Sequence, residues 1–110
     1  MKQNKVLSMI GLATKARKTV SGEFSVEKAV KGKKAHLVIV ADDASDNTKK
    51  KFRNMCEFYQ VPICFHGNKE ELGHAMGKEQ RSSMAVLDEG FANAVKQKLK
   101  LESEGIEWQK

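Results

Sequence analysis

The sequence predicts an α/β domain, a three-layer α/β/α sandwich in which helices cover both faces of a central sheet. Three observations favour this class. Apolar residues recur at helical spacing in several segments, short apolar and β-branched runs stand between those segments, and 110 residues suffice for one modest core. We therefore expect a single domain over residues 1–110, with a core from about 4 to 100 and a tail over 102–110.

The first half of the chain alternates helical and extended patterns. Val6, Ile10 and Ala13 stand at intervals of three and four residues, which is typical of a helix with one buried face. The continuous apolar run 37–41 is typical of a strand buried on both faces. The predicted elements in chain order are a helix over 4–14, a short strand or extended turn over 15–21, a helix from Gly22 to Gly32, a strand over 37–41 and a helix over 46–59.

The second half continues the alternation. Pro62 interrupts the pattern before a short apolar segment. Asn68 with Glu71 three positions later has the spacing of a capping box, which marks the start of a helix. The predicted elements are a strand over 63–65, a helix from Asn68 to Gly77, a polar loop over 78–82, a strand over 84–87 and a last helix over 90–101.

The net charge of +6 is distributed unevenly along the chain. Nine basic and two acidic residues stand in the first 34 positions, a net charge of +7, whereas the remainder carries 11 basic and 12 acidic residues, a net charge of −1. A polyanion is the natural partner for such asymmetry. The alternative is a charge that serves solubility on exposed faces.

The sequence carries no pattern typical of export or membrane insertion. Its longest apolar run, 37–41, is far too short to span a bilayer, and residues 6–13 lack the cleavage site of a signal peptide. Two cysteines are too few for a disulfide scaffold. We expect a cytoplasmic protein with reduced thiols and no membrane partner.

Motifs of nucleotide-dependent enzymes are absent from the sequence. The segment 73–78 resembles a phosphate-binding loop, but only three residues separate Gly73 from Gly77, and Glu79 follows Lys78 where that loop needs Ser or Thr. The spacing of Cys56, Cys64, His66 and His74 also lacks the paired ligands of common zinc sites. We expect buried structural thiols, no metal, no cofactor and no enzymatic activity.

Asp42, Asp43 and Asp46 follow the central apolar run. Carboxylates at the end of a buried strand can bind Mg²⁺, and helix capping before the next helix is the simpler interpretation. The lysine run 49–51 that follows is expected to form a solvated helix face.

Two basic clusters flank the second predicted helix. One comprises Lys15, Arg17 and Lys18, and the other contains Lys33 and Lys34. Lysine and arginine clusters neutralise phosphates, and the start of a helix offers free backbone N–H groups. A glycine at that start, Gly22, either lets a phosphate approach the backbone or simply completes a turn.

The aromatic residues give little support for recognition by stacking. Most of the Phe and Tyr side chains fall at positions typical of a core, and no predicted strand is rich in rings. Surfaces of the RRM or OB type are therefore not indicated. If RNA is bound, we expect backbone charge and RNA shape to dominate.

Several segments, in register along residues 4–100, resemble the kink-turn-binding ribosomal protein family of the L-seven-Ae type. The segments that carry the resemblance are Gly22 with Lys28, residues 33–44 (KKAHLVIVADDA), 56–57 (CE), 61–63 (VPI), 68–77 (NKEELGHAMG) and 82–87 (SSMAVL). Residues 11–18 (GLATKARK), 43–45 (DAS) and 90–93 (GFAN) are particularly similar to the bacterial YlxQ branch of that family.

The resemblance implies a sandwich with a mixed central sheet and the binding of sharply bent RNA. It places Gly22 at the start of the helix that enters the RNA groove, Lys28 on the same helix, and a loop from Gly77 to Ser82 over the bulged nucleotides. The chain departs from the family at the helix start, where Phe24 and Ser25 stand in place of the Asn-Glu whose side chains contact the G·A pairs at the bend. Its loop over 78–81 (KEQR) is also more polar than in typical members.

We therefore expect a non-catalytic, monomeric protein that binds structured RNA in a ribosomal or other ribonucleoprotein context. A protein-interaction module on the same fold is the alternative, and its binding would survive high salt. A third hypothesis, an enzyme that uses Asp42, Asp43 or Cys56, would need those groups in a cleft. The predicted RNA-binding residues are Lys15, Arg17, Lys18, Gly22, Glu23, Phe24, Ser25, Lys28, Lys33, Lys34, Lys78, Gln80, Arg81 and Ser82.

Overall fold

Four strands form one mixed sheet in the computed structural model, which describes residues 4–102. The strands are β1 (Thr19–Ser21), β2 (Leu37–Val40), β3 (Ile63–Phe65) and β4 (Ser83–Val86), and their order across the sheet is β1-β4-β2-β3. β4 pairs antiparallel with both β1 and β2, whereas β2 and β3 are parallel. β1 therefore lies at one edge of the sheet.

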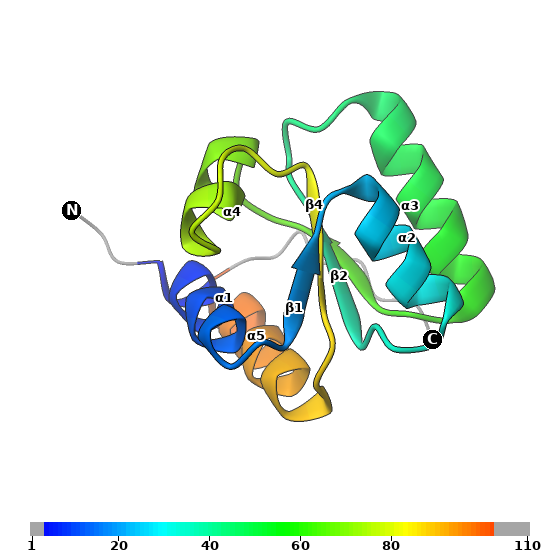
Figure 1. Ribbon diagram of the computed structural model, residues 1–110. Helices are drawn as coiled ribbons and strands as arrows, with labels where there is room; N and C mark the ends of the chain where they lie inside the picture. The colour runs from blue at the N-terminus through cyan, green and yellow to red at the C-terminus, as the bar shows by residue number, and fades with distance from the viewer. Residues whose placement is uncertain (1–3, 103–110) are drawn as a thin grey trace.

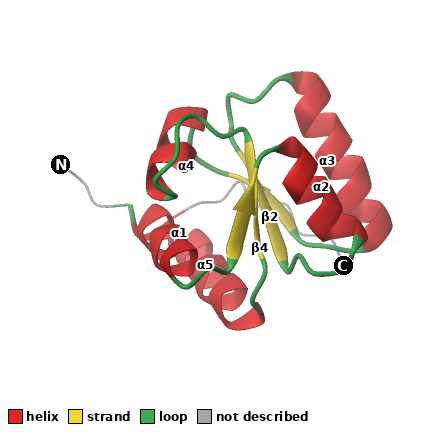
Figure 2. Cartoon of the chain, viewed as in Figure 1, coloured by secondary structure: helices red, strands yellow, loops and turns green. Residues whose placement is uncertain are grey.

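Helices cover both faces of this sheet. They are α1 (Lys5–Lys15), α2 (Glu23–Lys31), α3 (Asp46–Tyr59), α4 (Lys69–Ala75) and α5 (Glu89–Glu102). In Figures 1 and 2, α2 and α3 lie on one face, and α1, α4 and α5 lie on the other. The predicted three-layer α/β/α architecture with a mixed sheet is confirmed. The tail that was predicted over 102–110 lies almost entirely outside the described residues.

The core is continuous through the sheet. Every residue of β2 and β4 is buried, as expected for strands covered on both faces. Each helix contributes an apolar face to it, and the largest helical side chains with no exposed surface include Ile10, Phe52, Leu72 and Leu99. One polar side chain shares this environment: Ser83 is 1% exposed, and its hydroxyl has no hydrogen-bond partner among the described residues.

Capping fixes where several helices begin. The predicted capping box at Asn68 and Glu71 is present at the start of α4. The aspartates after β2 were expected to cap α3, but Ser45 caps it by accepting a hydrogen bond from the backbone N–H of Thr48. Asp43 instead accepts a hydrogen bond of 2.8 Å from the backbone N–H of Lys69, which links the end of β2 to the first turn of α4.

The lysine run 49–51 does not form a wholly solvated face. Lys51 pairs with Glu23 and Glu27 of α2 at 2.7 and 2.9 Å. Hydrogen bonds from Lys31 and Lys51 lower the pKa of the Glu27 carboxyl, and those to Glu23 and Glu27 raise the pKa of Lys51. These exposed pairs hold α2 against α3 and add little to stability.

Both thiols are buried, as predicted. Burial raises the pKa of Cys56 to about 12, and burial together with the nearby Asp42 carboxylate raises the pKa of Cys64 to about 12. Among residues 4–102 no cluster of three metal-ligating side chains occurs. No described helix is both long and apolar enough to cross a bilayer.

Candidate nucleic-acid interface

A basic groove runs beside the edge strand β1. In Figure 1 this strand lies between α1 and α2. It consists of two adjoining pockets of about 410 and 420 Å³ that share Val20 and Ser25 in their walls. Five cationic side chains line it, and no acidic residue occurs among the described residues of its walls. The first pocket is lined by Arg17, Lys78 and Arg81, and the second by Lys28 and Lys34.

A residue with left-handed backbone conformation follows each of α1 and α2, and these two residues position the two basic clusters beside the groove. Arg17 follows α1 with φ of 62°, and Lys33 follows α2 with φ of 60°. The next residue in each case donates its N–H back into the helix, Lys18 to Ala13 and Lys34 to Ala29, both at 2.9 Å. The chain therefore turns sharply at each end, and cationic side chains stand at both turns.

The loop after α4 closes the first pocket. The Nε of Arg81 donates a hydrogen bond of 3.0 Å to the hydroxyl of Ser21 in β1, and the backbone N–H of Arg81 donates to the carbonyl of Lys69 at 3.0 Å. The loop also packs tightly on α4, because a Cβ on Gly73 would lie 1.7 Å from the carbonyl oxygen of Glu79. Lys78 and Arg81 are thus held on a fixed loop.

Gly22 is the N-cap of α2 and directly follows the last residue of β1. Its φ of 93° lies in the region that favours glycine, its N–H donates to the carbonyl of Ser83 at 3.1 Å, and it provides no side-chain cap. No heavy atom lies within 4 Å of the place where a Cβ would stand. Gly22 therefore completes a turn, as one interpretation of the sequence had it, and the space beside it is open; the approach of a phosphate to the first-turn N–H groups of α2 stays a prediction.

The remaining predicted residues lie outside the walls of the groove. Exposed side chains at Lys15, Lys18 and Lys33 flank it at the helix ends. Glu23 is engaged with Lys51, and Phe24 is 78% exposed on α2.

Two predicted loop residues also lie away from the groove. Gln80 lines a different pocket with Glu70, His74 and Glu79. Ser82 is half-buried, and its carbonyl accepts from Ala41.

Sequence reasoning missed the polar residues of β1 itself. Thr19 and Ser21 alternate along the strand and line the first pocket together with Thr14 of α1, whose hydroxyl lies 3.0 Å from that of Thr19. The period-two spacing of Thr19 and Ser21 was the available signal, because alternate residues of a strand share one face.

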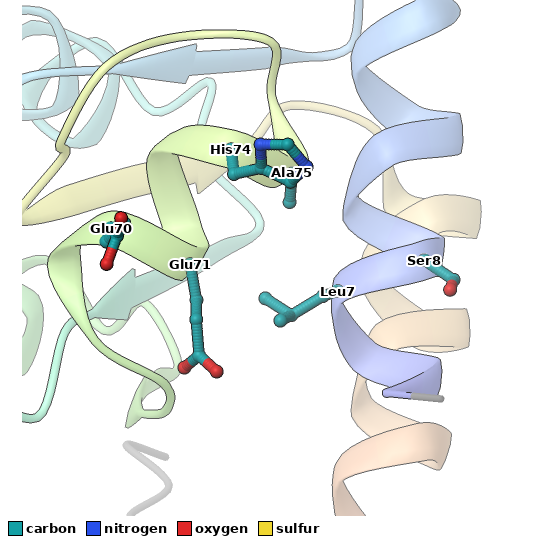
Figure 3. A pocket seen from close by; sticks show the side chains of 6 residues that line it. All are labelled: Leu7, Ser8, Glu70, Glu71, His74 and Ala75. Atoms are coloured by element: carbon teal, nitrogen blue, oxygen red, sulfur yellow. The ribbon is translucent and has the colours of Figure 1, made fainter. Parts of the chain in front are cut away.

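A second hollow, between α1 and α4, has the opposite character. Figure 3 shows Leu7 pointing from α1 towards α4, with Glu70 and Glu71 on the facing helix. The described residues that line this pocket, of about 430 Å³, include two carboxylates and His74 but no lysine or arginine. A polyanion would be repelled there, so charge selects the groove at β1.

Comparison with known proteins agrees with the sequence resemblance. Residues 4–96 match the Ribosomal protein L7Ae/L30e/S12e/Gadd45 family. The RNA-binding protein YlxQ of Bacillus subtilis is 46% identical over 85 residues, 77% of this chain and 85% of the relative. The YlxQ of Enterococcus faecium is 37% identical over 95 residues, 86% of this chain and 91% of the relative.

Solved structures share the same fold. A protein of unknown function from Bacillus halodurans superposes with a TM-score of 0.86 at 40% identity and covers 89% of this chain and 99% of its own. A Giardia lamblia 15.5 kDa RNA-binding protein superposes at 0.74 with 23% identity, over 92% and 90% of the two chains. The family match over most of the chain, together with the two YlxQ relatives, shows that this protein belongs to the L7Ae/L30e/S12e/Gadd45 ribosomal protein family and is of the YlxQ type.

Proposed function

We propose that this protein binds structured RNA through the basic groove, as a monomer without a cofactor and in a ribosomal or other ribonucleoprotein setting. One observation carries the proposal: five cationic side chains, and no acidic residue among the described lining, converge on a groove beside an open helix N-terminus. Relatives 46% and 37% identical are RNA-binding proteins, which supports the same conclusion.

Phosphate neutralisation is the main source of affinity in such a groove. If each of the five cations contacts one phosphate, the logarithm of the binding constant falls with the logarithm of salt concentration with a slope of roughly −4.5, on the scale measured for duplex DNA. Arg17 and Arg81 can each hold one phosphate through two N–H groups, whereas Lys28, Lys34 and Lys78 act as point charges.

Bent RNA of the kink-turn type is the ligand that we propose. The cations come from two directions, Lys78 and Arg81 from the loop after α4, and Lys28 and Lys34 from α2 and the turn that follows it, with the open N-terminus of α2 between them. A sharp bend brings the phosphates of two helical arms close together, so a kinked RNA can reach both sets. A straight duplex presents one smooth backbone surface and engages fewer of them.

A titration against a labelled kink-turn RNA and a straight duplex of equal length, at two salt concentrations, tests the proposal. We expect tighter, salt-dependent binding to the kinked RNA. Lys28→Ala should reduce the salt slope by about one, whereas Lys50→Ala, an exposed lysine of α3 outside the groove, should leave it unchanged. Equal, weak binding to both RNAs would contradict the proposal and favour a protein partner.

A further inference from the structure

Phe24 is unusually exposed for an apolar side chain in this fold. It is the second residue of α2 and 78% exposed, although the sequence pattern put most aromatic residues in the core. Among the described large apolar side chains, Phe58 matches it at 77%, and Leu12 follows at 53%. No packing contact among residues 4–102 therefore accounts for a phenyl ring at this position.

The surroundings of Phe24 are cationic on the side that faces the groove. Lys28 follows it by four residues and so lies one turn further along the same helix face. Lys28 lines the groove, as does Ser25, the residue next to Phe24. Glu23 directly precedes Phe24 and Glu27 follows it by three residues, and both carboxylates are already engaged by Lys51. The ring thus stands at the margin of a positive surface whose nearest carboxylates are occupied.

We propose that Phe24 is a stacking platform for one unpaired nucleobase of the bound RNA. This inference rests on the proposed function and adds a recognition mode to it. An aromatic face binds any nucleobase by stacking, provided that the base is free of its own helix. Lys28 then holds a phosphate beside that base, and the open N–H groups at the start of α2 can hold another.

A nucleobase fits this ring better than an apolar protein side chain does. The phenyl group is 78% exposed, and its sequence neighbour Ser25 and its helix neighbour Lys28 line the groove that has five cationic side chains in its walls. A nucleotide combines a flat ring with a phosphate, so one ligand satisfies both features. A phenyl ring offers no hydrogen bond to a base edge. Phe24 therefore selects a nucleobase by whether it is unpaired and by its size.

Two matched substitutions separate stacking from general surface effects. Phe24→Ala should weaken binding of an RNA with an unpaired base at its bend by roughly 5- to 100-fold, the range typical of base–aromatic stacking, with the salt slope unchanged. Phe58→Ala removes an equally exposed ring from α3 and should change nothing. Phe24→Trp should restore the affinity.

A set of RNAs, each with one unpaired base replaced by an abasic site, identifies the partner of the ring. At one position the abasic RNA should bind the wild-type protein as weakly as the Phe24→Ala variant binds the intact RNA. The Phe24→Ala variant should then bind that abasic RNA with no further loss of affinity. Equal losses at every position, or intact binding by Phe24→Ala, would overturn the stacking role.

Fluorescence gives an independent measurement. Trp108 is the one tryptophan in the sequence, so a Trp108→Phe background permits a probe at Phe24→Trp or at the control Phe58→Trp. Stacking predicts that RNA quenches the probe at position 24 and leaves the probe at 58 unaffected. If the wild-type protein binds kinked RNA in a salt-dependent manner and neither readout responds at position 24, stacking fails while the proposed function stands. Failure of the wild-type protein to bind RNA would remove both.

Discussion

The guanidinium of Arg81 donates a hydrogen bond of 3.0 Å through Nε to the hydroxyl of Ser21. This bond joins the loop after α4 to the last residue of the edge strand, across 60 positions of sequence. A second bond, from the Nη1 of Arg81 to the carbonyl of Gln80, leaves the guanidinium with fixed orientation and unused N–H groups. The charge of Arg81 is therefore oriented before a ligand arrives.

Ser21→Ala separates the orientation of this charge from its presence. We expect RNA affinity to fall a few-fold with an unchanged salt slope, because Arg81 keeps its charge but loses the partner that orients it. Arg81→Ala should lower the affinity further and reduce the slope by about one. The measurement is the same salt-dependent titration, with Ser8→Ala, an exposed serine of α1, as the control. A reduced slope for Ser21→Ala would show that orientation and charge cannot be separated here.

Gly73→Ala tests the packing of the loop against α4. A Cβ at this position would overlap the carbonyl oxygen of Glu79, so either the loop moves or the helix does. We expect a loss of roughly 1–3 kcal/mol in the free energy of unfolding, as for other overpacked sites. Denaturant unfolding measures the loss, and His74→Ala, at the exposed neighbouring position, should leave stability unchanged. Wild-type stability of Gly73→Ala would mean that the loop is not held against α4.

Ser83→Ala should be neutral or stabilising by up to about 1 kcal/mol, because it removes a buried hydroxyl that has no partner among the described residues. Ser45→Ala serves as the comparison. It removes the N-cap of α3 and should lower the free energy of unfolding by about 1 kcal/mol. Thermal or denaturant unfolding of both variants checks the pair. A loss for Ser83→Ala as large as that for Ser45→Ala would indicate a partner for the hydroxyl.

The two buried thiols predict a loss of stability in alkali. Their pKa values of about 12 in the folded chain exceed the ordinary value of 9.0, so unfolded thiols ionise first as the pH rises. The stability that this difference supplies is complete below pH 9 and is lost as the pH rises from 9 towards 12. Unfolding free energies measured from pH 8 upwards should therefore decline.

Replacing both cysteines by Ala should flatten the alkaline part of that decline. At pH 8 an alkylating reagent should modify Cys56 and Cys64 only after the protein is unfolded. Rapid modification of the native protein would contradict the burial of the thiols.

The layers of this fold were predictable because their signals are local. Helical spacing, the apolar run of β2 and the capping box at Asn68 each lie within a few residues, and all appear in the structure. The pairing of β1 with β4 is not local: Thr19 lies opposite Val86, and no short pattern specifies such a partner. The mixed sheet was predicted from the family resemblance and could not be predicted from periodicity alone.

The site was less predictable than the fold. Basic clusters pointed to the region where the structure has the groove, but they could not separate wall residues such as Arg17 and Lys28 from flanking ones such as Lys15. The interaction of Lys51 with Glu23 crosses 28 positions, so a charge run on one helix gave no sign of it. The exposure of Phe24 could not be predicted for a different reason. Apolar residues are assigned to a core by their type, and only the direction of this side chain from α2 in the structure shows that it is exposed.

The central place of β4 has a consequence for the newly made chain. During translation the basic first third and the β2–β3 pair are complete before β4 exists, so β1 has no strand to pair with and Arg81 is not yet present. A nascent chain at that stage attracts polyanions through charge alone. The discrimination of RNA shape that we propose requires β4 between β1 and β2, so selectivity would be gained later in synthesis than the positive charge.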